Sequence, residues 1–160
     1  MEALERICAC LPGDVARRAR QRADDLTELR LRPGGRPQLC FAGGDELLNQ
    51  PLSPEEFRNI AARMLEFSLY AWEDELRRGF FTLPGGSRVG VCGRYAVEKG
   101  EIGGISYISA LCVRVAREVR GTGRALAEAM LDSGGVKSAL LISRPGMGKT
   151  TLLRDTARLL

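Results

Sequence analysis

Residues 140–155 read LLISRPGMGKTTLLRD, and this stretch decides how the C-terminal part of the chain is expected to fold. It opens with an apolar run at 140–142, which is typical of a buried parallel strand. A loop with glycines follows, and from Lys149 onward apolar residues recur at helical spacing. These are Leu152, Leu153, Ala157 and Leu160. A strand, a glycine-containing loop and a helix, in this order, predict a phosphate-binding loop (P-loop).

Each part of this loop suits one part of a nucleoside triphosphate. Glycines let backbone N–H groups turn inward onto phosphate oxygens, and the helix N-terminus adds further N–H donors with a partial positive charge. We predict that Lys149 bridges the β- and γ-phosphates and that the Thr150 hydroxyl binds Mg²⁺. These two are the candidate catalytic residues, Thr150 is the candidate metal ligand, and ATP and Mg²⁺ are the expected cofactors. The predicted nucleotide-binding residues are Ser143, Arg144, Pro145, Gly146, Met147, Gly148, Lys149, Thr150 and Thr151.

The loop departs from the general pattern G-x-x-x-x-G-K-[ST] at its first position, where Ser143 stands in place of glycine. Serine is small, so the turn remains possible. The alternative interpretation is a glycine-rich turn between a strand and a helix that binds no ligand. Lys149 is one of three lysines in the chain, and it stands where the motif requires a lysine.

The composition limits the class of protein. A chain of 160 residues with 44% hydrophobic and 28% charged residues suits one ordinary domain, or a small domain with part of another. The net charge of +4 does not by itself indicate nucleic acid. The chain has no histidine, which excludes Ser-His and Cys-His nucleophile systems, and its five scattered cysteines lack the spacing of a zinc site. We expect reduced thiols and a cytoplasmic protein, peripheral to a membrane only through partners.

The pattern along the chain predicts an α+β N-terminal domain followed by the first strand–P-loop–helix unit of an α/β P-loop domain. The α+β domain covers 1–120, a helical linker covers 121–135, and the P-loop domain begins at 136–160. Within the first domain we expect helices in 1–23 with a break at 11–13, a helix with a capping box from Ser53, and a second helix containing Leu69, Trp72 and Leu76. We expect strands at 26–32, 37–41 and 105–115, and a hairpin of 80–83 and 88–93.

Four stretches in a fixed order resemble one protein family. They are ELRLRPGGRP (28–37), GFFTLPGGSRVGVCGR (79–94), ISYISALCVRVAREVRG (105–121) and SRPGMGKTTLLRD (143–155). Together they are similar to the stage III sporulation protein AA family, a branch of the secretion-type AAA/P-loop ATPases of endospore-forming bacteria. The resemblance covers nearly the whole chain. The family's loop commonly starts with serine, as here at Ser143, while Arg144 stands where proline is more usual.

The resemblance implies a ring-forming ATPase that powers a channel-like assembly between mother cell and forespore. The implied partners are further copies of the protein, in a ring homo-oligomer, and membrane-embedded sporulation channel proteins. Members of the family continue past the loop into a complete ATPase domain, so residues 136–160 are expected to be the beginning of a truncated domain. It would lack the acidic strand end that positions Mg²⁺ and the residue that orients water, and would be inactive alone.

Further interpretations remain open. The basic segments 17–22 and 114–124 raise the alternative of a nucleic-acid-binding module fused to a P-loop protein, although no aromatic residues are interleaved for base stacking. The nucleic-acid signal is therefore not strong, and a solvated helix face explains the first segment as well. For Arg114, Arg117 and Arg120 the alternatives are a solvated edge or, as the resemblance implies, an arginine that meets the γ-phosphate. An intact small nucleotide-binding protein is a third interpretation.

Overall fold

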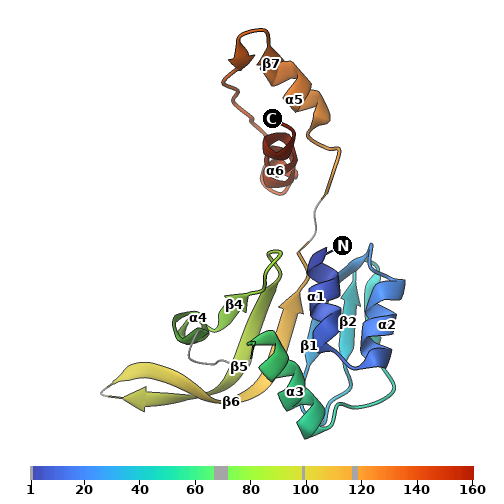
Figure 1. Ribbon diagram of the computed structural model, residues 1–160, viewed down its shortest axis with the longest axis vertical. Coiled ribbons are helices and arrows are strands. Elements are labelled where there is room, and N and C mark those ends of the chain that lie inside the picture. Colours follow the sequence, from blue (N-terminus) through green and yellow to red (C-terminus); the bar gives the residue numbers. More distant parts are fainter. Residues whose placement is uncertain (1, 67–71, 99, 117–118) are drawn as a thin grey trace. The chain divides into compact units, whose positions relative to one another are not determined.

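The computed structural model describes residues 2–66, 72–98, 100–116 and 119–160 (Figure 1). The chain forms two compact units, Met1–Ala116 (unit 1) and Arg117–Leu160 (unit 2). No helix in the described ranges combines the length and the apolar character that crossing a membrane requires. Each unit is described separately below.

Unit 1 begins with two amphipathic helices, α1 (Glu2–Cys10) and α2 (Gly13–Gln21). The predicted break between them is confirmed, because Pro12 lacks a backbone N–H and stands as the N-cap of α2. Both helices turn small or branched apolar side chains inward, among them Ile7 and Val15, which are buried.

A six-stranded antiparallel sheet forms the body of unit 1, with the strand order β3-β2-β1-β6-β5-β4. The strands are β1 (Leu26–Leu31), β2 (Gln38–Phe41), β3 (Gly44–Leu47), β4 (Phe80–Thr82), β5 (Arg88–Glu98) and β6 (Glu101–Arg114). The predicted strands are confirmed, and the predicted hairpin is the β4–β5 pair. β3 was not predicted, because this edge strand is mostly exposed and shows no alternation of apolar and polar residues.

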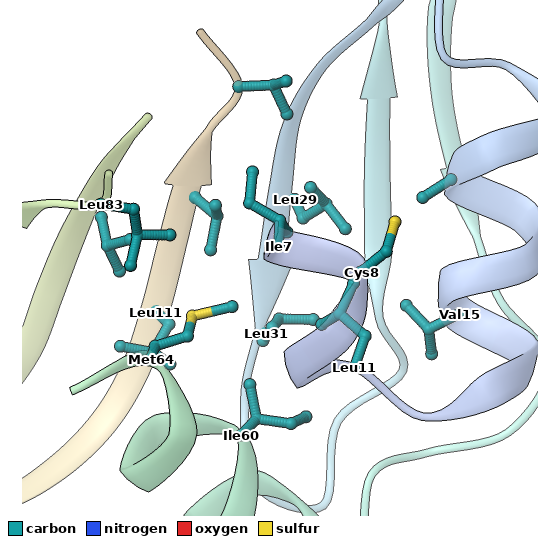
Figure 2. Packing of buried hydrophobic residues seen from close by; sticks show 14 of the residues in the cluster. Ile7, Cys8, Leu11, Val15, Leu29, Leu31, Ile60, Met64, Leu83 and Leu111 are labelled. Carbon is teal, nitrogen blue, oxygen red and sulfur yellow. The ribbon is translucent and has the colours of Figure 1, made fainter. Parts of the chain in front are cut away.

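The core lies between one face of this sheet and the helices. Figure 2 shows Ile7 of α1, Leu11 just after α1 and Ile60 of α3 (Pro54–Met64) in the same cluster as Leu31 and Leu111 of the sheet. The capping box predicted at the start of α3 is confirmed. Ser53 Oγ accepts a hydrogen bond from Glu56 N at 3.1 Å, and Ser53 N donates to Glu56 Oε2 at 2.7 Å. This pair fixes where α3 begins and so which of its faces meets the sheet.

The second predicted helix is shorter than expected. α4 spans Glu73–Arg77, and Leu76 on it is buried. Trp72 precedes α4 and packs against Phe81 with 5.3 Å between ring centroids, so this partly buried indole packs against the core. Leu69 lies outside the described residues.

β5 and β6 continue together past the other strands as a two-stranded arm (Figure 1). Register shifts between Cys92 and Gly93, and again before Tyr95, bend the arm. At the first bend the backbones approach closely: a Cβ added to Gly93 would lie 2.0 Å from the Tyr107 carbonyl oxygen. The bend therefore depends on the absence of a side chain at this position.

The five cysteines all lie within the described residues and are free thiols. Cys8 and Cys40 are buried. Burial raises the pKa of Cys40 to about 11, and a hydrogen bond with Asp45 adds to the rise. A thiol with so high a pKa stays protonated at neutral pH, so it is not a nucleophile.

Unit 2 contains α5 (Arg124–Met130), a short hairpin of β7 (Leu131–Asp132) and β8 (Gly135–Val136), and α6 (Lys149–Leu159). The prediction of a strand at 140–142 is wrong for this structure. Residues 137–144 have no regular structure, and Leu140 and Ile142 are 85% and 82% exposed. A buried parallel strand takes its hydrogen bonds from neighbouring strands, and the strands described in unit 2 are β7 and β8, which pair with each other.

We predict that Gly93→Ala lowers the free energy of unfolding of unit 1 by about 1–3 kcal/mol, because the new methyl group cannot fit against the Tyr107 carbonyl. Gly90→Ala on the same strand is the matched control. Its Cβ would lie 3.7 Å from Cys112, an ordinary contact, so the change stays within about 1 kcal/mol. Urea denaturation followed by circular dichroism measures both. Equal stabilities of the two variants would contradict the close approach at Gly93.

Candidate functional site

The loop before α6 has the backbone form that the motif predicts at its glycines. Gly146 and Gly148 both have φ of 79°, in the left-handed region that glycine adopts without strain. Gly148 is the N-cap of α6, and no side chain caps this helix. The N–H groups of the first helical turn therefore keep their capacity to bind an anion.

Lys149 folds back over the start of the loop. Its Nζ donates to the carbonyl oxygens of Ser143 at 2.9 Å and Arg144 at 3.1 Å, and it lies 3.3 Å from Ser143 Oγ. Within the described residues its acceptors are thus carbonyl and hydroxyl oxygens, without a carboxylate. The positive charge is held in place but not neutralised, which is the state in which an ammonium group best attracts an incoming anion.

The other predicted site residues flank Lys149 in the sequence. Pro145 and Gly146 form the turn of the loop, and Met147 is exposed at its tip. Thr150 and Thr151 follow on the first turn of α6, and both are exposed. Ser143 occupies the position of the motif's first glycine, and its hydroxyl donates to the Arg144 carbonyl oxygen at 3.2 Å.

Among the described residues, no three His, Cys, Asp or Glu side chains gather into a group that could hold a metal ion. The candidate Mg²⁺ ligand is therefore the Thr150 hydroxyl together with phosphate oxygens. This fits the coordination preference of Mg²⁺, which usually binds one or two protein ligands and completes its coordination shell with phosphate oxygens and water.

The structure adds a cluster of residues that the sequence did not indicate. We call it the α5–α6 clasp, consisting of Gly123, Asp155, Thr156 and Arg158. Gly123 N donates to Asp155 Oδ2 at 2.7 Å, and Arg158 Nη2 donates to Asp155 Oδ1 at 2.6 Å. Thr156 Oγ1 lies 3.4 Å from the Gly123 carbonyl oxygen and donates to the Leu152 carbonyl oxygen at 2.8 Å. Asp155 and Thr156 are 4% and 3% exposed.

The helix predicted after the loop is confirmed as α6, and the clasp shows which side chains it buries. Of the apolar residues that recur at helical spacing, Leu153, Ala157 and Leu160 are exposed in unit 2. The buried residues of α6 are instead Asp155 and Thr156. A buried carboxylate is tolerated because Gly123 and Arg158 satisfy it. The available sequence signal was the three-residue spacing of Asp155 and Arg158, typical of a helical ion pair.

The basic segments have different environments. On α2, Arg18 forms two hydrogen bonds with the Glu46 carboxylate at 2.6 and 2.7 Å, and Arg20 pairs with Glu5 at 2.8 Å. Arg22 pairs with Asp25 and lies over the Phe41 ring. These carboxylates offset the charge of three arginines in the first of the two basic segments.

The Arg114 side chain at the end of β6 is exposed, while its neighbours Val113 and Val115 are buried. Its Nη2 lies 3.6 Å from Glu28 Oε2. Arg117 lies outside the described residues, and Arg120 is described in unit 2 and has an interaction partner. A γ-phosphate contact by any of the three stays a prediction.

The sequence matches known proteins over most of its length. The family model described as "Sporulation stage III, protein AA" matches residues 2–160. The "Stage III sporulation protein AA" of Bacillus subtilis (strain 168) is 34% identical over 135 residues, which are 84% of this chain and 44% of that protein. The chain therefore spans less than half the length of this curated relative.

Two solved structures are similar. The VirB11 ATPase from the Brucella suis type IV secretion system, in complex with sulphate, has a TM-score of 0.46 and 19% identity, covering 96% of this chain and 44% of that one. The Legionella pneumophila ATPase DotB has a TM-score of 0.44 and 13% identity, covering 93% of this chain and 43% of that one.

The hydrogen bonds to Asp155 in the clasp predict that unit 2 loses stability when this carboxylate is protonated at acid pH. Hydrogen bonding from Gly123 and the nearby Arg158 hold the pKa of Asp155 below its ordinary value. Because the folded-state pKa is the lower one, the ionised carboxylate stabilises unit 2 fully above the unfolded value of about 3.9. This stabilisation is lost as the pH falls through the folded-state value. The amide shift of Gly123, followed by NMR between about pH 2 and 6, measures this change.

In Asp155→Asn the pH-dependent change of the Gly123 amide shift should disappear. The amide of Gly134 is an internal control, because it donates to a different carboxylate, Asp132, and should titrate unchanged. A pH-dependent change of the Gly123 amide shift that is the same in both proteins would show that Asp155 is not its cause.

Proposed function

Because the chain belongs to the sporulation stage III protein AA family, we propose that it binds ATP through residues 143–151. In this proposal the bound nucleotide is hydrolysed by a longer protein of which this chain is part. The observation that carries the proposal is the Lys149 ammonium group, held inside a glycine loop at the N-terminus of α6 by neutral oxygens of Ser143 and Arg144. A fixed, uncompensated cation beside free helix N–H groups is a site for phosphate.

The residues present fit a nucleoside triphosphate with Mg²⁺. Backbone N–H groups of the loop and the first turn of α6 would donate to phosphate oxygens. Lys149 would exchange its carbonyl partners for phosphate oxygens, which are stronger acceptors because they are charged. The exposed Thr150 hydroxyl would be a ligand of Mg²⁺. When bound, ATP supplies the transferable phosphoryl group and Mg²⁺ neutralises its charge.

The cellular role is a proposal that rests on the family. We propose that the longer protein is an ATPase that powers a channel assembly between mother cell and forespore. Its partners in this proposal are copies of itself, arranged in a ring, and membrane-embedded sporulation channel proteins. The match to the Bacillus subtilis stage III protein supports the sporulation setting. The resemblance of the four sequence stretches to the secretion-type ATPase branch supports the choice of a motor.

We predict that Lys149→Ala weakens binding of Mg²⁺·ATP by about tenfold or more, because it removes a charge-assisted hydrogen bond to phosphate. The matched control is Lys137→Ala, which removes the same charge from unit 2 at an exposed pair with Asp132. Titration with a fluorescent ATP analogue measures both. Equal affinities of the two lysine variants would contradict the site.

Thr150→Ala should weaken binding with Mg²⁺ present and have little effect in EDTA.

We also predict that these 160 residues alone do not turn over ATP. Phosphoryl transfer requires a positioned metal and a positioned water, and among the described residues no group of three His, Cys, Asp or Glu side chains could hold the metal beside Thr150. A phosphate-release assay tests this. Turnover at about 1 s⁻¹ or faster, abolished by Lys149→Ala, would contradict it.

A further inference from the structure

α6 is attached to the rest of unit 2 in an unusual way. Its two buried side chains are Asp155 and Thr156, both polar, while Leu153 and Leu159 on the same helix are exposed. Helices of globular proteins are normally held by an apolar face. In the described part of unit 2, α6 is instead held largely by the directional contacts of the α5–α6 clasp.

The clasp combines a hydrogen-bonded and a steric component. Gly123 N donates to Asp155 Oδ2, and Gly123 itself is buried against the backbone of α6. A Cβ at Gly123 would lie 2.3 Å from Thr156 N and 2.7 Å from Thr156 Oγ1. The helix thus rests directly on the glycine backbone, at a distance that leaves no room for movement toward it.

The same carboxylate also completes a second helix. Gly123 is the N-cap of α5, and α5 has no side-chain cap of its own. Asp155 on α6 accepts from the N–H of this N-cap residue, one of the donors at the start of a helix that has no partner within the helix, and Arg158 compensates its charge. One carboxylate therefore ties the start of α5 to the middle of α6, and neither helix can shift along or rotate about its axis without breaking this bond.

We propose that Asp155 is a positioning residue for the phosphate-binding loop: by fixing α6 against Gly123, it sets where the first turn of α6 presents Lys149 and Thr150. Asp155 lies six residues after Lys149 on an 11-residue helix, about 9 Å along its axis. A helix this short moves as one body, so a displacement at the clasp displaces Lys149 as well. This inference rests on the proposed ATP site.

The coupling must act in both directions. If the clasp favours the loop position that binds phosphate, bound phosphate favours the closed clasp to the same degree. Adding Mg²⁺·ATP should therefore shift the Gly123 amide resonance and slow its hydrogen exchange, although Gly123 is not part of the predicted site. A carboxylate that only stabilised the fold would leave the Gly123 amide insensitive to nucleotide.

The test uses the ¹⁵N-labelled chain titrated with Mg²⁺·ATP, with affinity read from the amides of Gly146 and Gly148. We expect Asp155→Ala to weaken binding about tenfold, the lower end of what residues that orient a binding group contribute. Asp155→Asn keeps an acceptor for Gly123 N without the charge and should restore part of the affinity. Asp132→Asn is the matched control: it removes an aspartate that also accepts from a glycine N–H in unit 2, and it should bind like the unmodified chain.

Two results would overturn the inference. One is Asp155→Ala binding as tightly as Asp132→Asn, and the other is a Gly123 amide that ignores nucleotide while Gly146 and Gly148 respond. If Asp155→Ala loses helix content by circular dichroism, Arg158→Ala replaces it, because it loosens the carboxylate without removing it. Arg158→Ala must then weaken binding, or the inference fails.

Failure of the proposed function has a different signature. In that case the unmodified chain and Lys149→Ala respond equally weakly to Mg²⁺·ATP at Gly146 and Gly148. The positioning role then falls together with the site. A Lys149-dependent response that is unaffected at Asp155 contradicts the positioning role alone.

Discussion

β1 pairs antiparallel with β6, with Leu29 opposite Val113 and Leu31 opposite Leu111, and the rest of unit 1 depends on this pairing. It joins β3-β2-β1 to β6-β5-β4 in one sheet. The four apolar side chains of the pairing all face the core under α1 and α3. A contact between segments so distant in sequence costs much chain entropy, and burial of a continuous apolar face compensates it.

Local chemistry made part of this fold predictable. Ser53 and Glu56 specify the start of α3 within four residues, and the alternation around Leu29 specifies a half-buried strand without reference to the rest of the chain. The sequence pattern did not indicate β3, because an exposed edge strand has no buried face and so no alternation of apolar and polar residues. The apolar run 140–142 predicted a strand that is not formed, since strand formation depends on partners that local sequence does not supply.

In the candidate site, too, some features are set by local sequence and others by residues far away in the chain. The glycine loop and Lys149 are contiguous in sequence, so their geometry could be anticipated. Whether a basic residue is available for a ligand could not, because that depends on distant acids. Arg18 is paired with Glu46, which comes from another element, whereas Lys149 contacts neutral oxygens of its own loop. The capacity of a basic residue to bind an anion thus depends on whether a carboxylate already pairs with it.

The burial of Asp155 could not be predicted from the sequence, because an aspartate on a helix is normally exposed to solvent. Burying it requires an acceptor-donor match with Gly123 that only the fold creates. Apolar packing stabilises a helix but tolerates small rotations, since dispersion contacts are not directional. A short hydrogen bond to a buried carboxylate fixes direction as well as distance. In the proposed site, a helix with Lys149 at one end benefits more from fixed direction than from added stability, because the ammonium group would have to meet phosphate within a few tenths of an ångström.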